Sequence, residues 1–249
     1  MPTKLRIGTW NIGSKRNHDA IISRIAELDL DVCAMQEVWL DCATDLPALA
    51  NRGGSGGYCW YFTPALSPYE LDRHKSEYYG LAILSREPLR WSASFQLGPG
   101  SLDRKLTSES EPRIVQLAAS HLKRPIIVGN THLAATDDWT PSSIRQSQAS
   151  RLSDILRAVA GQGDVVLCGD FNTGPSSSDL GELRNVLPHG YASIRGTYVG
   201  EPERPPIDFF RSSTELALEV LVYAAKGLSD HDIAVATLQL DDATPNFFG

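Results

Sequence analysis

The chain of 249 residues has 23 Lys and Arg against 30 Asp and Glu, a formal net charge of −7 at pH 7. This balance argues against broad electrostatic binding to nucleic acid, leaves room for a local basic groove, and suits a protein that collects divalent cations. With 42% hydrophobic and 21% charged residues and no Pro/Gly/Ser-rich linker between its halves, the sequence predicts a single globular domain over residues 1–249.

The cysteines and the apolar runs bear on the cellular compartment. The four cysteines lack C-x-x-C spacing, so we do not expect a zinc site, while a disulfide between Cys42 and Cys59 stays open. The first residues lack the apolar core of a secretory signal, and no apolar run is long enough to span a membrane. We therefore expect a reduced, cytoplasmic protein without a membrane anchor, and we expect a monomer.

The N-terminal segment predicts a strand–helix–strand unit. Residues 5–10 form a strand pattern that ends at Asn11. Residues 19–29 carry apolar side chains at helical spacing, and residues 31–35 form a second strand that ends at Gln36-Glu37. A right-handed crossover would make the two strands parallel neighbours, with both ends on the sheet edge where ligands gather in α/β folds.

The middle of the chain predicts strands joined by polar loops. A Gly-rich stretch over residues 51–57 lacks the spacing of the phosphate-binding glycine motifs, and we expect a flexible loop there. Further loops are expected over residues 67–76 and 98–111. The expected strands cover residues 58–63, 79–84, 89–97, 114–119 and 126–128, and the last one leads into Asn130–Leu133.

The C-terminal part combines one long helix with further strands. Residues 141–160 keep helical spacing throughout, with Pro141 in the first turn. The next strand is apolar on both faces and ends at Asp170 and Asn172, whose side chains share one side if the backbone stays extended. A short helix over 179–187, a proline-rich loop over 201–206, and strands over 216–224 and 233–240 complete the pattern. Hairpins mixed with strand–helix alternation favour two packed, mixed sheets with helices outside.

Polar side chains stand where most of the predicted strands end. A single one would be a solvated strand end or a turn signal, but a shared sheet edge would bring them together. Glu37 is the clearest candidate metal ligand, with Asn11 and Asp230 beside it, because Mg²⁺ prefers one or two carboxylates together with waters and a substrate phosphate. The full set is Asn11, Glu37, His132, Asp170, Asn172, Asp208, Asp230 and His231.

His231 and Asp208 together suggest a general base. A buried carboxylate fixes the tautomer of a histidine and raises its basicity, and the paired histidine could then deprotonate a water molecule. Asp170 would orient that water, and His132 would contact a phosphate or protonate the leaving oxygen.

Six short motifs resemble, in the same order, those of the endonuclease/exonuclease/phosphatase superfamily, which includes pancreatic-type deoxyribonuclease. They are Thr9–Asn11, Gln36-Glu37, Asn130–Leu133, Gly169–Asn172, Ile207-Asp208 and Ser229–His231, and residues 79–86 resemble the strand after the acidic motif. The resemblance implies a four-layer α/β/β/α sandwich of two mixed β-sheets flanked by helices. It also implies phosphoester cleavage that depends on Mg²⁺, with Mn²⁺ as the alternative. Glu37 would bind the metal, with Asn11 and Asp230 close to it, and the number of ions stays open.

The other motif positions also acquire roles from this resemblance. Asp170 would position the nucleophilic water, and Asn172 would contact the phosphate. Asp208 and His231 would form the base dyad, and His132 would support the transition-state phosphate, as in the branch that includes sphingomyelinase and the deadenylases.

The branch of the family is less well defined. Asn130–Leu133 and Pro205–Asp208 depart from the runs usual in abasic-site nucleases and inositol-phosphate 5-phosphatases, and the sequence shows no hydrophobic hairpin of the sphingomyelinase type. Residues 132–152 loosely resemble a helix of deadenylase-like and small bacterial members. Arg113 and Arg145 are candidates for further phosphate contacts, with solvated surface arginines as the equal alternative.

Three functions remain open from the sequence. The first is a metal-dependent phosphodiesterase that acts on nucleic acid or a nucleotide. The second is a phosphomonoesterase that acts on a small phosphorylated metabolite or a lipid head group, which the acidic balance mildly favours. The third is an inactive module that only binds a phosphate ligand, and it is disfavoured because every expected catalytic position is filled.

Overall fold

A computed structural model describes residues 3–13, 15, 17–41, 57–66, 77–98, 111–122, 125–136, 140–201, 203–216 and 218–240. The loops expected over 51–57, 67–76 and 98–111 lie outside these residues except at their ends, as does Cys42. Cys59 has a free thiol, as do Cys33 and Cys168. Within the described ranges, no helix is both long and apolar enough to cross a membrane.

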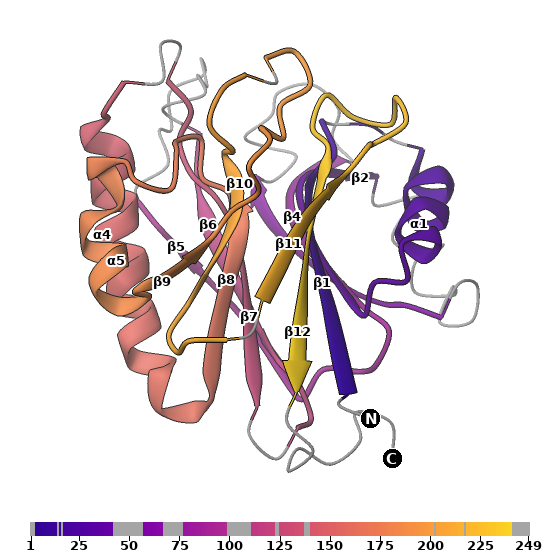
Figure 1. The fold of residues 1–249 in the computed structure, drawn as a ribbon, viewed down its shortest axis with the longest axis horizontal. Helices are drawn as coiled ribbons and strands as arrows, with labels where there is room; N and C mark the ends of the chain where they lie inside the picture. Colours follow the sequence, from indigo (N-terminus) through magenta and orange to yellow (C-terminus); the bar gives the residue numbers. More distant parts are fainter. Residues whose placement is uncertain are drawn as a thin grey trace.

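Two six-stranded sheets lie face to face in the part of the chain that the structure describes (Figure 1). The first has the order β11 (Leu218–Tyr223), β12 (Ile233–Leu240), β1 (Thr3–Asn11), β2 (Val32–Asp41), β4 (Glu77–Ser85) and β3 (Cys59–Leu66). The second has the order β5 (Trp91–Gln96), β6 (Ile114–Ala119), β7 (Ile126–His132), β8 (Asp164–Asp170), β10 (Asp208–Ser212) and β9 (His189–Tyr191). Both are mixed, because β1 runs parallel to β2 and β7 runs parallel to β8 while the other pairs are antiparallel.

Helices cover the two outer faces. Helix α1 (His18–Glu27) packs on the first sheet, and α4 (Ser143–Val159) and α5 (Gly181–Val186) pack on the second (Figure 1). Two 3₁₀ turns, η1 (Ala160–Gln162) and η2 (Ser178–Leu180), adjoin α4 and α5. The expected four-layer α/β/β/α sandwich is therefore confirmed.

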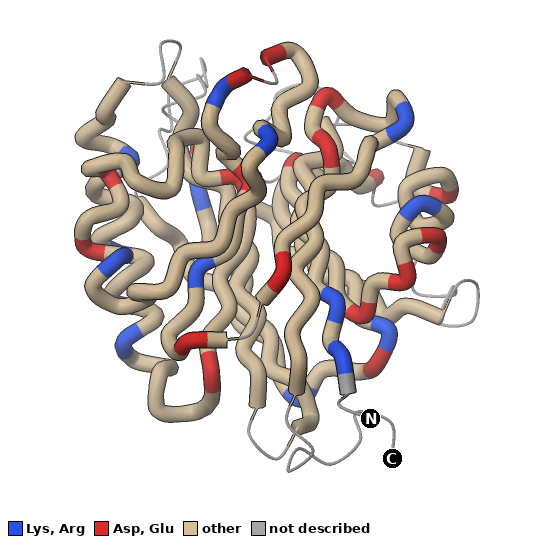
Figure 2. The backbone as a smooth tube through the Cα atoms, in the orientation of Figure 1, with Lys and Arg blue, Asp and Glu red and all other residues tan. Residues whose placement is uncertain are grey.

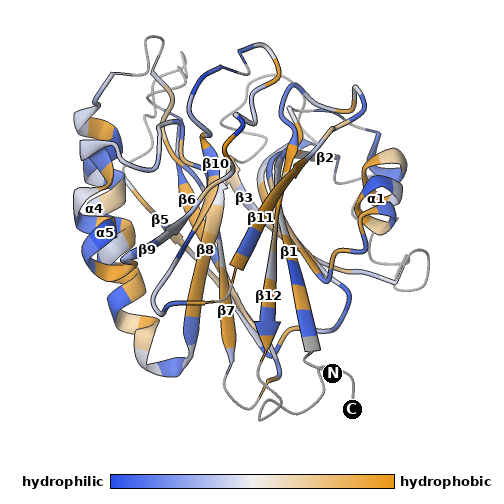
Figure 3. Cartoon of the chain, viewed as in Figure 1, coloured by the Kyte–Doolittle hydropathy of each residue, from blue (hydrophilic) through white to orange (hydrophobic). Residues whose placement is uncertain are grey.

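The apolar side chains divide into three clusters that match these layers. One lies between the sheets and includes Ile7, Val128 and Phe210, while the other two lie under the helices. Because successive side chains of a strand point to opposite faces, a strand covered on both sides is apolar along its whole length. The inner strands β7 and β8 are accordingly largely hydrophobic in Figure 3, whereas edge strands such as β9 and β11 also carry hydrophilic residues. Most charged residues lie on the helices and loops in Figure 2.

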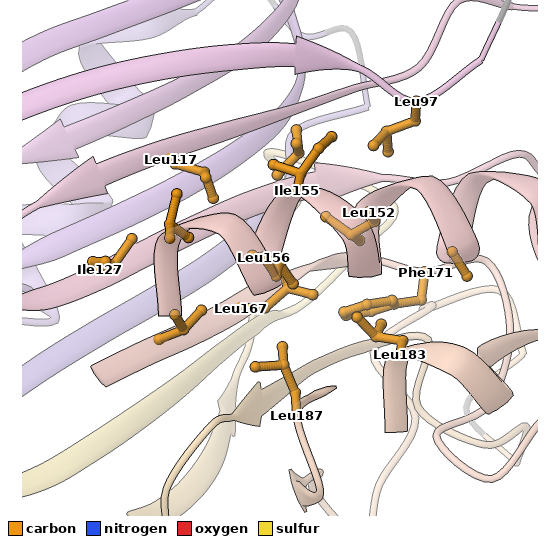
Figure 4. Close-up of a cluster of buried hydrophobic side chains, with 14 of the residues drawn as sticks. Leu97, Leu117, Ile127, Leu152, Ile155, Leu156, Leu167, Phe171, Leu183 and Leu187 are labelled. Carbon is orange, nitrogen blue, oxygen red and sulfur yellow. The ribbon is translucent and has the colours of Figure 1, made fainter. Parts of the chain in front are cut away.

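Helix α4 shows how local sequence builds an outer layer. The Ser142 side chain accepts a hydrogen bond from the backbone N–H of Arg145 and caps the helix. Pro141 therefore lies before the cap and not in the first helical turn, which corrects the expected start. Leu152 and Leu156 reach from the helix toward the sheet, where they meet Leu167 and its neighbours (Figure 4).

The sheet topology brings the predicted strand ends to one edge, the upper edge in Figure 1. His132 at the end of β7 is in register with Asp170 at the end of β8, and Asp170 is in register with Asp208 at the start of antiparallel β10. Asn11 ends β1, and β12 starts beside it just after His231. Strand β9 and the continuation of β2 beyond Glu37 were not expected from the sequence.

Candidate active site

Asp170 occupies the centre of the polar strand ends. Its Oδ2 accepts a hydrogen bond from Asn11 Nδ2 at 3.0 Å. The Nε2 atoms of His132 and His231 lie 3.7 and 3.9 Å from the same oxygen. All four side chains are at least nine-tenths buried. The structure thus brings together residues from four separate motifs around one carboxylate oxygen.

His231 has the carboxylate partner expected for it. Its Nδ1 lies 2.8 Å from Asp208 Oδ2, inside the protein. The hydroxyl of Thr197 donates a second hydrogen bond to the same oxygen, and the Tyr198 ring stands edge-on to the imidazole at 5.3 Å. The His231 backbone N–H donates to Ser229 Oγ, which fixes the turn before β12. The imidazole therefore has a defined position, with Nε2 toward Asp170.

The buried charges perturb one another. Burial, and then the negative charge of Asp208, raises the pKa of Asp170 to about 7. Burial alone would lower the pKa of His231, but the carboxylates around it, Asp208 first, outweigh burial and raise that pKa to about 10. Burial thus favours the neutral form of Asp170, while the carboxylates around His231 favour the protonated form of its ring. Such strongly perturbed groups in one cluster are typical of functional sites.

Glu37 sits in a β-bulge, and this differs from the expected strand end. The pairing of β2 with β4 shifts register between Met35 and Val38, and Glu37 has a left-handed φ of 55°. A non-glycine residue in this region carries strain that its surroundings must offset. The bulge turns the Glu37 carboxylate toward Asn11, whose Nδ2 donates to Glu37 Oε1 at 3.0 Å.

A buried amide network supports this bulge from the opposite sheet. Asn130 Nδ2 donates to the carbonyl oxygens of Met35 and Ala82, both at 3.0 Å. Gln36 Nε2 donates to Asn130 Oδ1 at 2.7 Å and to Thr9 Oγ1 at 3.1 Å. Gln36 and Asn130 belong to two of the sequence motifs, but the motifs alone indicate no role for them. Their amide side chains inside otherwise apolar strands are the signal that could have revealed it.

The donors near Glu37 suit a hard cation. Asn11 links Glu37 to Asp170 through its Nδ2, while its Oδ1 accepts the backbone N–H of Gly13. Asp230 lies beside the same turn, since a Cβ added to Gly13 would lie 2.6 Å from Asp230 Oδ1. Gly13 has a φ of 57°, so the turn needs glycine both for its backbone and for this close approach. Carboxylate and amide oxygens are the ligands that Mg²⁺ and Mn²⁺ prefer.

A second group could also hold an ion. The ligand atoms of Asp170, Asp208 and His231 all lie within 4.8 Å of one another. The contact between His231 and Asp208 is, however, a hydrogen bond, and the same Asp208 oxygen also accepts from Thr197. An ion bound to Asp208 Oδ2 and His231 Nδ1 would have to break that bond, and a hard cation prefers oxygen donors such as those of Glu37 and its neighbours to an imidazole nitrogen.

Asn172 does not continue the extended strand. Strand β8 ends at Asp170, and Asn172 has a left-handed φ of 51°. Its backbone N–H donates to Asp170 Oδ1 at 2.8 Å, and its Nδ2 donates to the Leu133 carbonyl at 2.9 Å. The expected side-by-side arrangement of the two side chains is therefore replaced by a turn in which the Asp170 carboxylate accepts from the Asn172 backbone. Phe171 does face the core, stacked on Phe209 with ring centroids 4.0 Å apart.

His132 is held by Arg113, a residue expected from the sequence to contact phosphate directly. Arg113 Nη1 donates to His132 Nδ1 at 2.8 Å, and Arg113 Nη2 lies 2.9 Å from Glu111 Oε2. Arg113 is buried, so the alternative of a solvated surface arginine is wrong. The contact connects the start of β6 to the active-site histidine.

The expected phosphate contact of Arg145 is wrong, and so is its solvated alternative. The side chain is fully buried, and its Nε donates to Asp179 Oδ2 at 2.7 Å. Its Nη atoms donate to the carbonyl oxygens of Ala134 and Thr140. Arg145 therefore ties α4 to η2 and to the segment after β7, and no donor is directed at the site.

We expect Arg145→Met to lower the free energy of unfolding by about 3–5 kcal/mol, because the variant leaves Asp179 as a buried, unpaired charge. Urea denaturation measures the change. Arg157→Met in the same helix is the matched control, and its half-exposed guanidinium should contribute little. Unfolding of Arg145→Met at the wild-type urea concentration would contradict this role.

Comparison with known proteins adds to this geometry. A family model described as the endonuclease/exonuclease/phosphatase family matches residues 8–231. No curated protein matches the chain in sequence.

Solved structures share the fold at low sequence identity. An endonuclease/exonuclease/phosphatase family protein from Bacteroides thetaiotaomicron is 17% identical with a TM-score of 0.66, over 97% of this chain and 99% of that one. The human Nocturnin catalytic domain with a bound sulfate anion is 20% identical with a TM-score of 0.69, over 96% and 94%. A mannosyl-6-phosphatase of Bacteroides thetaiotaomicron is 16% identical with a TM-score of 0.65, over 94% and 99%.

Proposed function

The chain belongs to the endonuclease/exonuclease/phosphatase family, a family of phosphoric ester hydrolases, and from this premise we propose that it is a Mg²⁺-dependent phosphodiesterase. Its substrate would be a nucleic acid or a nucleotide. The observation that carries the proposal is the convergence of the His132 and His231 Nε2 atoms on Asp170 Oδ2, with His231 backed by Asp208.

In the proposed reaction, water attacks phosphorus in line with the leaving oxygen, and each site residue has a separate role. Asp170, held by Asn11, orients the water, and His231 accepts its proton through Nε2 while Asp208 stabilises the imidazolium that results. His132 Nε2 and Asn172 contact the phosphate oxygens.

A resident cation would be held by Glu37, with Asn11 and Asp230 close to it. When bound, the cation supplies positive charge that neutralises the oxyanion developing at phosphorus and favours the neutral form of His231. The fit rests on the oxygen-rich donor set at Glu37 and on the bulge that aims its carboxylate. Mn²⁺ would serve in place of Mg²⁺, because both accept carboxylate and amide oxygens.

A phosphomonoesterase acting on a small phosphorylated metabolite or lipid head group is the second candidate. The net charge of −7 favours a small substrate over a long polyanion. The mannosyl-6-phosphatase among the structural neighbours is consistent with this candidate, although its 16% identity shows only the shared fold. A single domain, a cytoplasmic location and a monomeric state remain predictions from the sequence.

Turnover of a diester and a monoester, measured in parallel with and without Mg²⁺, tests the proposal. We expect hydrolysis of bis-p-nitrophenyl phosphate, and then of plasmid DNA or RNA, that chelation with EDTA abolishes and added Mg²⁺ or Mn²⁺ restores. Addition of Ca²⁺ in place of Mg²⁺, in buffer free of Zn²⁺, is the control that shows whether a divalent ion acts only by stabilising the fold. Metal-dependent release from p-nitrophenyl phosphate alone would favour the monoesterase. Equal turnover with and without metal would contradict both candidates.

A further inference from the structure

The contact between Arg113 and His132 determines which imidazole nitrogen carries the proton. A guanidinium has N–H donors and no acceptor. Because Arg113 Nη1 lies 2.8 Å from His132 Nδ1 in the protein interior, Nδ1 must accept and cannot carry a hydrogen. The proton of the ring then resides on Nε2.

Arg113 is itself held in place. Its Nη2 forms an ion pair with Glu111 Oε2 at 2.9 Å, and both Arg113 and His132 are buried. The charged and titratable groups that face His132 are Arg113 before β6, Asp170 at the end of β8, and His231 before β12. Burial, and then the positive charge of Arg113, lowers the pKa of His132 well below its usual range. The ring is consequently neutral as well as fixed in one tautomer.

The protonated nitrogen is directed at the reaction centre. His132 Nε2 lies 3.7 Å from Asp170 Oδ2, too far for a hydrogen bond of its own. His231 Nε2 lies 3.9 Å from the same oxygen. An oxygen of a phosphate placed between the two histidines could accept the Nε2–H of His132.

We propose that Arg113 is a positioning residue that holds His132 as a neutral Nε2–H donor, so that His132 hydrogen-bonds the phosphate and does not protonate the leaving oxygen. This inference rests on the proposed function and assigns Arg113 an action through His132 in place of a direct phosphate contact. The proton balance is simple, because the His132 Nε2–H remains on the ring throughout. Proton transfer then falls to His231 and water.

Nitrogen NMR of ¹⁵N-labelled histidine side chains tests the tautomer without any turnover. The His132 signals are identified by their loss in His132→Gln. In the wild type we expect one protonated ring nitrogen, assigned as Nε2, between about pH 5.5 and 8. A protonated Nδ1, or an imidazolium in that range, would overturn the proposal.

Arg113→Met removes the donor while keeping an apolar side chain of similar length. We expect His132 in this variant to titrate within the same range or to populate both tautomers, and we expect Arg113→Lys, which keeps a donor, to restore the wild-type pattern in part. Arg24→Met is the matched control, because Arg24 is also buried and bonded to a glutamate and a carbonyl, but in the α1 layer. Wild-type His132 signals in Arg113→Met would show that Arg113 does not set the tautomer.

The kinetic arm separates positioning from stability. We expect Arg113→Met to lower kcat by about 10–100-fold with a small change in KM, as for other groups that orient a catalytic side chain. Arg24→Met, and Arg113→Lys to a lesser degree, should retain kcat at an equal folded fraction. If no phosphate ester is hydrolysed by the wild type, the proposed function fails, while the NMR arm still decides the tautomer. If Arg113→Met does not fold, the wild-type spectrum and Arg113→Lys carry the test.

Discussion

Glu37→Gln is expected to abolish metal-dependent turnover of phosphate esters, lowering kcat/KM by about 10³-fold or more at moderate Mg²⁺. A bound metal contributes several kcal/mol of transition-state stabilisation, and each 1.36 kcal/mol is about a factor of ten in rate. Gln keeps the side-chain length and can still accept the hydrogen bond from Asn11 Nδ2, so only the charge is removed. Steady-state kinetics over a Mg²⁺ titration measures the effect.

A control variant separates the effect of losing the charge at Glu37 from the effect of losing one carboxylate anywhere in the protein. Glu182→Gln makes the same chemical change on α5, where Glu182 is exposed beside Arg157. That variant should retain wild-type kinetics. Calorimetric titration with Mg²⁺ gives a second measurement that does not depend on substrate, and Glu37→Gln should bind the ion more weakly. Wild-type metal affinity and turnover in Glu37→Gln would remove Glu37 from the metal site.

The sequence predicts the layers of the fold because the faces that become buried determine the spacing of apolar residues along each strand and helix. Residues 126–128 are apolar on both faces and lie in β7, and residues 5–10 carry the strand pattern that becomes β1; both strands lie inside their sheets. Residues 141–160 keep helical spacing, and Ser143–Val159 form α4. The three-residue strand β9 carries no such pattern, since it is half-exposed and pairs only at the edge of its sheet. Its formation depends on β10 beside it, which is a tertiary effect.

The sequence predicts where the candidate site residues lie better than it predicts their hydrogen-bond partners. Strand ends converge through topology, so the meeting of His132, Asp170 and Asp208 follows from parallel and antiparallel pairing. The β-bulge at Glu37 depends on hydrogen bonds from Asn130 in the other sheet, 94 residues beyond Gln36. A local sequence pattern cannot predict a contact between residues so far apart in the chain.

Two arginines likewise show that the sequence does not predict the partners of a side chain. Arg113 and Arg145 were indistinguishable in sequence, because each is a cation near a polar motif. The structure gives one a histidine and the other a buried aspartate. The difference arises from the side chains that the fold places opposite each of them, and composition near the residue does not encode it.

Thr197 is a further residue that sequence reasoning missed. Its hydroxyl donates to Asp208 Oδ2, the oxygen that also binds His231. Thr197 precedes the proline-rich loop and lies eleven residues before Asp208, with no apolar period to link the two. Thr197 therefore acts on the His231 imidazole only through the Asp208 carboxylate, which it helps to hold in position.

Asp208→Asn is expected to lower kcat by about 10²–10⁴-fold while leaving the fold intact. The substitution keeps the shape of the side chain but replaces the charge that stabilises the His231 imidazolium. The amide can also present an N–H to His231 Nδ1, and the ring would then carry its proton on Nε2, where a base must be bare. Single-turnover kinetics on the diester, together with thermal unfolding of the variant, measures both parts of the prediction.

The dyad can be tested as a unit with a double variant. If Asp208 acts only through His231, then His231→Ala should lower kcat by a similar factor, and the double variant should be little slower than His231→Ala alone. Thr197→Val should give a smaller loss than Asp208→Asn, and Thr197→Ser, which keeps the hydroxyl, should be close to wild type. Fully multiplicative losses in the double variant would mean that the two side chains act independently, and the 2.8 Å contact between them would then have no catalytic role.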